Sequence, residues 1–316
     1  MLPQAADFRA EADALHALLV TLNDADWERA TQFKGWTVND IVQHLHDGDQ
    51  MAAASVEGPD QFAAFRAERQ ALIDTGLTRV QAARRRLGDL TGTRLLARWH
   101  ACVADLCDKL SAMPSDARLK WAGPDMGVRM FTTARQMETW AHGQAIYDLM
   151  DVVRTPTDRL RNIVEIGVRT YGWTFANRKL AVPGPVPYVR LNAASGAIWE
   201  WNDHTPDNAV EGEGLAFCQV VTQVRNVTDT NLRVTGEPAR IWMKVTPVMP
   251  MKLSSATLST FTGVSAAILM RATTRLGSSG SSRRVCTSPT LMPLKRTSPP
   301  SVRPLTAPSK RTLYTE

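Results

Sequence analysis

The sequence predicts a mainly helical domain, then a smaller α+β domain, then a tail of different composition. Apolar residues recur at helical spacing through most of the first 177 residues. Short segments rich in aromatic and β-branched residues, typical of strands, follow a turn-rich connector at 182–187. Both patterns fade after about residue 245. We therefore assign 1–180 to the helical domain, 181–245 to the α+β domain and 246–316 to a low-complexity basic tail.

Composition places the chain among ordinary soluble proteins. Of its 316 residues, 44% are hydrophobic and 22% are charged. The sequence has no run of about 18 apolar residues, so we expect no membrane span. The N-terminus lacks the basic-then-apolar order of a signal peptide. The four cysteines form no Cys-x-x-Cys pair, so we expect them to be reduced. These features predict a cytoplasmic protein.

The formal charge of +6 is unevenly distributed. Residues 241–316 carry a net charge of +10, which leaves 1–240 at −4. Binding to nucleic acid would depend on the tail alone, and the tail lacks the interleaved aromatic residues that stack on bases. We therefore expect neither nucleic acid nor a membrane as a partner. The sequence does not specify an oligomeric state.

Periodicity and turn residues predict the helices of the first domain. Thr37 and Asp40 form a capping box that should start a helix near Val38. The run Arg84–Arg86 is expected to be a solvated helix end, where cations suit the helix dipole. The other predicted helices cover 5–22, 59–88 with an interruption near Thr75-Gly76, 93–110, 131–150 and 158–177.

The second domain is predicted to mix strands and helices. Strands are expected at 189–191, 198–202 and 232–234, because aromatic and branched residues gather there. Helical spacing recurs at 214–225 and again from 237 to 245.

The tail supports two hypotheses. Of the 71 residues from 246 to 316, 32 are Ser, Thr or Pro, a composition typical of disorder. The second hypothesis is that the reading frame shifted near Val245, which would explain the abrupt loss of acidic residues.

The predicted helix Phe131–Met150 carries the chemistry of most interest. Glu138 and His142 lie four residues apart within an apolar stripe, so both side chains can reach one cation from the same side. The alternative is that Glu138 pairs with Arg135 while His142 is a hydrogen-bonded core residue. A third ligand would decide between them. His44 and His46 lie on opposite flanks of their own helix, and periodicity does not choose between them.

These residues resemble a known family. Trp36-Thr-Val with His44 downstream, followed by Arg135-x-x-Glu138-x-x-x-His142, is similar to the metal-binding four-helix bundle of the DinB-like superfamily. The branch that it most resembles contains mycothiol-dependent maleylpyruvate isomerases and mycothiol transferases. The segments 134–144, 157–161 and 217–223 look still more like an uncharacterised actinobacterial subgroup. The resemblance covers roughly 5–245.

The resemblance implies a site and a chemistry. It makes His44, Glu138 and His142 the protein ligands of a divalent metal, and it favours His44 over His46. Two imidazoles and a carboxylate with an open fourth position are typical of catalytic zinc. The implied partners are a small-molecule substrate and mycothiol, whose thiol a metal would activate for isomerisation or S-transfer. The alternative is a non-catalytic metal-binding or ligand-sensing module. No catalytic or cofactor-binding residue is assigned.

Further residues are candidates to support that site. Asp40, Asp47 and Arg135 could orient the ligands, although each could instead form an ordinary salt bridge. The family usually has an acidic residue three positions after the last histidine, where this chain has Ala145 and then Asp148. The resemblance also implies a basic residue from the smaller domain for a substrate carboxylate, with Arg190, Arg225 and Arg233 as the candidates.

Overall fold

The computed structural model describes residues 2–88 and 90–246, and all of these belong to one compact unit. The two hypotheses about the tail therefore lie, apart from Thr246, outside the described residues. Within them the predicted fold class is confirmed: a helical bundle is followed in the chain by a small sheet with its own helices.

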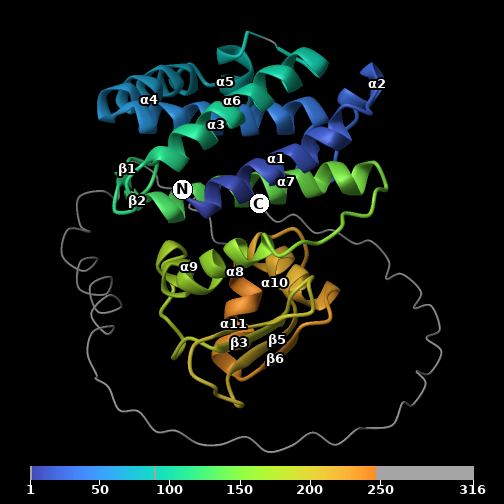
Figure 1. Ribbon diagram of the computed structural model, residues 1–316, viewed down its shortest axis with the longest axis vertical. Coiled ribbons are helices and arrows are strands. Elements are labelled where there is room, and N and C mark those ends of the chain that lie inside the picture. Colours follow the sequence, from blue (N-terminus) through green and yellow to red (C-terminus); the bar gives the residue numbers. More distant parts are fainter. Residues whose placement is uncertain (1, 89, 247–316) are drawn as a thin grey trace, which may run out of the picture. The chain divides into compact units, whose positions relative to one another are not determined.

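Four long helices form the bundle (Figure 1). Helix α1 packs against α6 and α7, and α3 packs against α6. Large side chains from all four fill one core, including Phe8, Ile41, Trp99 and Phe131. The helices of this part are α1 (Pro3–Leu19), α2 (Asp24–Trp27), α3 (Val38–Glu57), α4 (Pro59–Asp74), α5 (Arg79–Arg86), α6 (Gly92–Ala112) and α7 (Val128–Leu149).

Local sequence explains where α3 begins and where the next predicted helix breaks. The capping box is confirmed, with the Thr37 hydroxyl accepting from the backbone N–H of Asp40 and the Asp40 carboxylate accepting from that of Thr37. The predicted helix at 59–88 is interrupted between α4 and α5, at the position expected, where Gly76 adopts a φ of +93°.

The prediction that Arg84–Arg86 is a solvated helix end is wrong for Arg86, whereas Arg84 and Arg85 are exposed. Arg84 donates to Asp40 at 2.7 Å, and Arg86 donates to Asp47 at 2.8 Å. The Arg86 side chain is only 9% exposed. Helix α5 packs against α3, so Arg86 is buried against a carboxylate of that helix, while Arg84 meets a carboxylate of the same helix and stays in contact with water.

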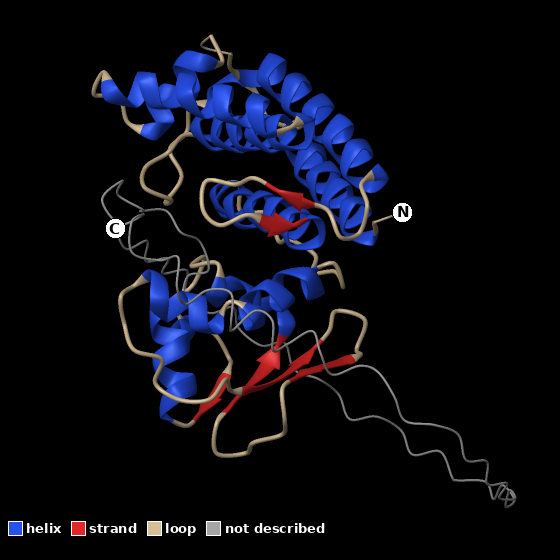
Figure 2. Cartoon of the chain, turned by 90° about the vertical axis from the view of Figure 1, so that its left-hand side faces the viewer, coloured by secondary structure: helices blue, strands red, loops and turns tan. Residues whose placement is uncertain are grey.

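The second part of the described chain is a four-stranded sheet with four helices (Figure 2). The strand order is β4-β3-β5-β6; β3 and β5 are parallel, and the other two pairs are antiparallel. Its elements are α8 (Leu160–Arg169), α9 (Tyr171–Asn177), β3 (Tyr188–Asn192), β4 (Ile198–Trp201), β5 (Ala209–Glu213), α10 (Gly214–Val221), a 3-10 helix (Val227–Asp229), β6 (Arg233–Thr235) and α11 (Glu237–Val245).

Three strands escaped prediction. Strand β5 occupies a central position, but its sequence Ala-Val-Glu-Gly-Glu has too few apolar residues to show a strand pattern. The two-residue strands β1 (Arg118–Leu119) and β2 (Met126–Gly127) pair across a loop that precedes α7. Such short strands leave no periodic pattern to detect.

Helix α7 is buried on more than one side. Phe131 and Ile146 belong to the core of the bundle. Met137 and Trp140 belong instead to a second core, which also contains Ile163 of α8 and side chains of the sheet. The boundary at 180–181 stays a prediction, although side chains of α8 and α9 already pack in this second core.

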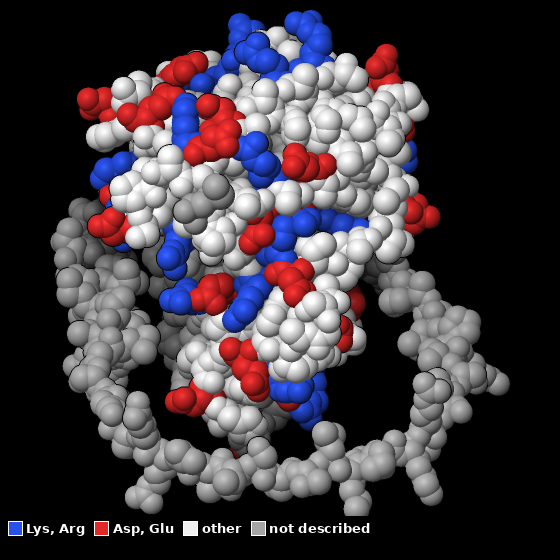
Figure 3. All heavy atoms as spheres, viewed as in Figure 1, with Lys and Arg blue, Asp and Glu red and all other residues white. Residues whose placement is uncertain are grey.

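The surface of the described chain carries charges of both signs. On the face shown in Figure 3, Lys and Arg side chains are interspersed with Asp and Glu. None of the described helices is both long enough and apolar enough to cross a membrane.

Two glycines with almost the same positive φ but different surroundings offer a paired test of the fold. Gly236, before α11, has a φ of +85°, and an added Cβ would lie 2.2 Å from the Asp207 carbonyl oxygen. Gly196 has a φ of +86°, with nothing within 4 Å of the added Cβ. We expect Gly196→Ala to lower the free energy of unfolding by about 1–2 kcal/mol. Gly236→Ala should cost roughly 1–3 kcal/mol more because the backbone must also move.

Urea unfolding of both variants measures this difference. Equal destabilisation by the two substitutions would contradict the packing described at Gly236.

Candidate metal centre

The three predicted ligands lie together, although they come from two helices that are distant in sequence. One oxygen of Glu138, Oε2, is 3.3 Å from His44 Nε2 and 3.3 Å from His142 Nε2. One donor atom from each residue lies within 4.8 Å of the other two. Within residues 2–88 and 90–246, no other group of three His, Cys, Asp or Glu residues converges in this way.

Helix geometry explains the arrangement. Glu138 and His142 are one turn apart on α7, while His44 comes from the second turn of α3, which begins after the cap at Thr37. The side chains of His44 and His142 are 18% and 13% exposed, and that of Glu138 is 9% exposed. The carboxylate is therefore enclosed while both imidazoles keep some contact with solvent.

The electrostatics favour an ionised carboxylate beside a neutral imidazole. Burial alone would raise the pKa of Glu138, but hydrogen bonds from His142 and His44 outweigh it and hold that pKa well below its usual range. Burial, assisted by the nearby His142, lowers the pKa of His44. Near neutral pH Glu138 is thus a carboxylate and His44 a neutral imidazole. These are the forms that a metal ion requires of its ligands.

The alternative in which Glu138 pairs with Arg135 does not match the structure. Arg135 Nε donates to Asp49 Oδ1 at 2.8 Å, and both side chains are almost fully buried. Asp49 also accepts from Trp99 Nε1 at 3.1 Å. The cation nearest in sequence to Glu138 is therefore hydrogen-bonded to another carboxylate, and the partners of Glu138 are the two histidines.

Two aromatic side chains form a wall beside the histidines. The Trp36 ring stacks on His142 at 6.1 Å with an interplanar angle of 13°, and its centroid is 5.3 Å from that of His44. Phe33 meets His142 edge-on at 4.9 Å. Trp36 belongs to the motif identified in the sequence. Phe33 was missed, and only the Lys34-Gly35 turn between them indicates that the two rings could meet.

The other residues considered as ligands or as orienting groups contact different parts of the protein. His46 is buried away from the cluster, with Nε2 3.5 Å from Gln50. Asp40 and Asp47 form the ordinary salt bridges with arginines of α5 that were the alternative to an orienting role.

Two of the three candidate arginines of the smaller domain form ion pairs within the described chain. Arg225 donates to both oxygens of Asp148, at 2.9 and 2.8 Å, and Arg233 pairs with Glu211. Ala145, where the family usually has an acidic residue, is buried. Asp148 therefore meets a cation of the smaller domain, a contact that sequence spacing could not reveal.

The buried pair of Arg135 and Asp49 generates a stability prediction. Arg135→Met leaves Asp49 buried without its cation and should lower the free energy of unfolding by about 3–5 kcal/mol. Burial raises the pKa of Asp49, and loss of the arginine should raise it further. The loss of free energy of unfolding should reach its full size above this raised pKa. It should become smaller as the pH falls and the carboxyl is protonated.

Denaturant unfolding at about pH 8 and about pH 5 measures both effects, with Arg135→Met/Asp49→Asn as the control. A double variant no more stable than Arg135→Met at pH 8 would contradict this account.

Comparisons with known proteins show which chains are similar to this one. Residues 8–147 match the family model of the mycothiol maleylpyruvate isomerase N-terminal domain. An uncharacterised protein of Mycobacterium tuberculosis, from strains CDC 1551 / Oshkosh and ATCC 25618 / H37Rv, is 34% identical over 247 residues. That alignment covers 77% of this chain and 93% of the relative.

Two solved structures are also similar. They are crystal structures of the mycothiol-dependent maleylpyruvate isomerase and of a histidine-to-alanine mutant of it, with 12% and 13% identity and TM-scores of 0.45 and 0.44. Each comparison covers 70% of this chain and 88% of the solved one. The family model places residues 8–147 in the mycothiol maleylpyruvate isomerase N-terminal domain family, and the chain as a whole belongs to the same family as the mycobacterial relative, which is itself uncharacterised.

Proposed function

We propose that this protein is a metal-dependent enzyme that acts with a low-molecular-weight thiol, mycothiol being the first candidate, as an isomerase or an S-transferase. The observation that carries the proposal is the convergence of His44, Glu138 and His142 in a member of this family. Its cytoplasmic location remains a prediction. A metal site without catalysis is the competing function, and thiol-dependent turnover distinguishes the two.

The donor set fits a divalent cation. An ionised Glu138 beside a neutral His44 leaves a buried negative charge without a permanent cation, in surroundings where an unpaired charge is costly. A bound divalent ion would reverse that sign and bring the three donors into one coordination sphere. Two imidazoles and one carboxylate are the ligands of many catalytic zinc sites, so zinc is the first choice.

The chain's own residues would perform three tasks. Glu138 supplies the negative charge, and the two imidazoles supply nitrogen donors from different helices. Phe33 and Trp36 cover one side of the histidines and exclude water there. A metal at this position would supply the positive charge that keeps a bound thiol deprotonated near neutral pH.

Metal binding is the first prediction of this proposed function. Wild-type protein dialysed against Zn²⁺ should retain about one equivalent, and His44→Ala, Glu138→Ala and His142→Ala should each retain much less because each removes one of three ligands. Elemental analysis of the purified proteins measures the stoichiometry. His46→Gln is the matched control, since it changes a histidine of the same helix outside the cluster. Loss of metal in His46→Gln but not in His44→Ala would overturn the assignment.

Thiol binding is the second prediction. Cobalt-substituted wild type should gain a thiolate-to-metal charge-transfer absorption when mycothiol is added, and S-methylated mycothiol should give none because it has no ionisable thiol. Turnover of maleylpyruvate or of an electrophilic S-acceptor should then require both metal and thiol. A stoichiometric metal site with no spectral response and no turnover would favour the non-catalytic function.

The aromatic wall generates a third prediction. Trp36→Leu should weaken Zn²⁺ binding about tenfold, the lower end of the effects measured for residues that support metal ligands, because His142 loses the ring that fixes its orientation. Trp36→Phe should retain most of the affinity. Competition with a chromophoric chelator measures both, with Trp201→Leu, in strand β4, as the control. Equal affinity in Trp36→Leu and wild type would rule out this supporting role.

A further inference from the structure

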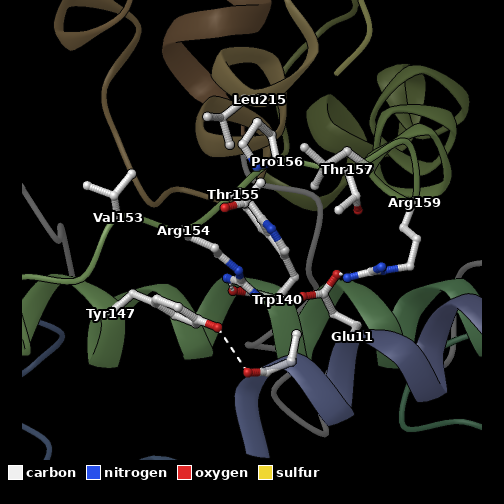
Figure 4. A pocket seen from close by; sticks show the side chains of 12 residues that line it. Glu11, Trp140, Tyr147, Val153, Arg154, Thr155, Pro156, Thr157, Arg159 and Leu215 are labelled. Atoms are coloured by element: carbon white, nitrogen blue, oxygen red, sulfur yellow. Dashed lines mark hydrogen bonds and ion pairs between the residues drawn. The ribbon is translucent and has the colours of Figure 1, made fainter. Parts of the chain in front are cut away.

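A cavity lies on the side of α7 away from the proposed metal centre. It has a volume of about 340 Å³ and lies between α1, α7, the connector that follows α7, and Leu215 of α10 (Figure 4). Glu11 of α1 and Trp140 of α7 line it, together with Arg154 and Arg159 of the connector. Such a volume suits a small ligand.

Helix geometry separates this cavity from the candidate metal centre. At 100° per residue, Trp140 and Tyr147 point almost opposite to Glu138 and His142 around α7. The residues that line the cavity include none of the three candidate metal ligands. A ligand here would therefore be held independently of the metal.

The cavity wall contains two cations and one anion. Arg154 Nη2 is 2.5 Å from Glu11 Oε1, and Arg159 Nε is 3.5 Å from Glu11 Oε2. Figure 4 shows both arginines directed at the Glu11 carboxylate from opposite sides. Among the described residues that line the cavity, these three are the charged ones. One positive charge is left without a counter-charge in the wall.

The two arginines are not held equally. Arg154 has an 8% exposed side chain, donates to the Trp140 carbonyl oxygen at 2.7 Å and lies over the rings of Trp140 and Tyr147. Arg159 is 24% exposed, and its ion pair with Glu11 is the longer of the two. Arg154 is therefore a structural cation, whereas Arg159 has donors to offer a ligand.

The rest of the lining indicates the chemical class of ligand. The hydroxyls of Thr155 and Thr157 are further polar groups, while Pro156, Leu160 and Leu215 are apolar. A guanidinium is well suited to a carboxylate because two parallel N–H donors can meet its two oxygens. We propose that this cavity binds a small monocarboxylate, with its charged group at Arg159 and its apolar body against the side chains of Leu160 and Leu215.

Butyrate and its amine analogue butylamine are probes for this site. The thermal unfolding midpoint of the full chain, measured against probe concentration at constant ionic strength, should show saturable stabilisation by butyrate and none by butylamine. Arg159→Gln should weaken butyrate binding about tenfold or more, because it removes a charged hydrogen bond. Arg161→Gln, an exposed arginine on α8, is the control and should bind like wild type.

Two further binding measurements separate this proposal from the metal centre and from a general anion site. Glu138→Ala should bind butyrate normally even if it no longer binds metal, so the two proposals can fail independently. Phosphate should bind more weakly than butyrate. The proposal is overturned if butyrate shows no saturable effect, if Arg159→Gln binds it like wild type, if Glu138→Ala abolishes binding, or if phosphate binds equally well.

Discussion

The burial of α7 on more than one side is the constraint on which the described structure depends. One side of this helix completes the bundle core through Phe131 and Ile146, and another joins Met137 and Trp140 to the core of the sheet domain. A polar side chain on such a helix needs a partner, because an unpaired buried polar group is costly. Arg135 meets this requirement with Asp49, and Gln136 with Asn162 and the Arg159 carbonyl oxygen.

Glu138 meets the same requirement differently. Its partners are two imidazoles instead of a permanent cation, so the carboxylate has no fixed counter-charge and could bind a divalent ion. A structural role alone would be served as well by a guanidinium. This difference between Arg135–Asp49 and Glu138–histidine is the physical argument for a metal centre in this chain.

The sequence predicted the bundle well because its helices are long and periodic, and because the Thr37–Asp40 cap marks the start of α3. It predicted the i, i+4 pair on α7 for the same reason. The choice of His44 over His46 needed the family resemblance, since the wheel places both on the flanks of the apolar stripe. Strand β5 and the contacts of Glu11 with Arg154 and Arg159 were missed. They depend on segments brought together by the fold, and their residues look like ordinary surface charges in the sequence.

One measurement tests the central claim most directly: X-ray absorption at the metal edge of the zinc-loaded protein, repeated on His44→Ala. The account predicts a wild-type spectrum with two imidazole ligands and further light oxygen or nitrogen donors, and the loss of one imidazole, or of the metal, in the variant. A wild-type spectrum without imidazole scattering, or one unchanged by His44→Ala, would contradict it.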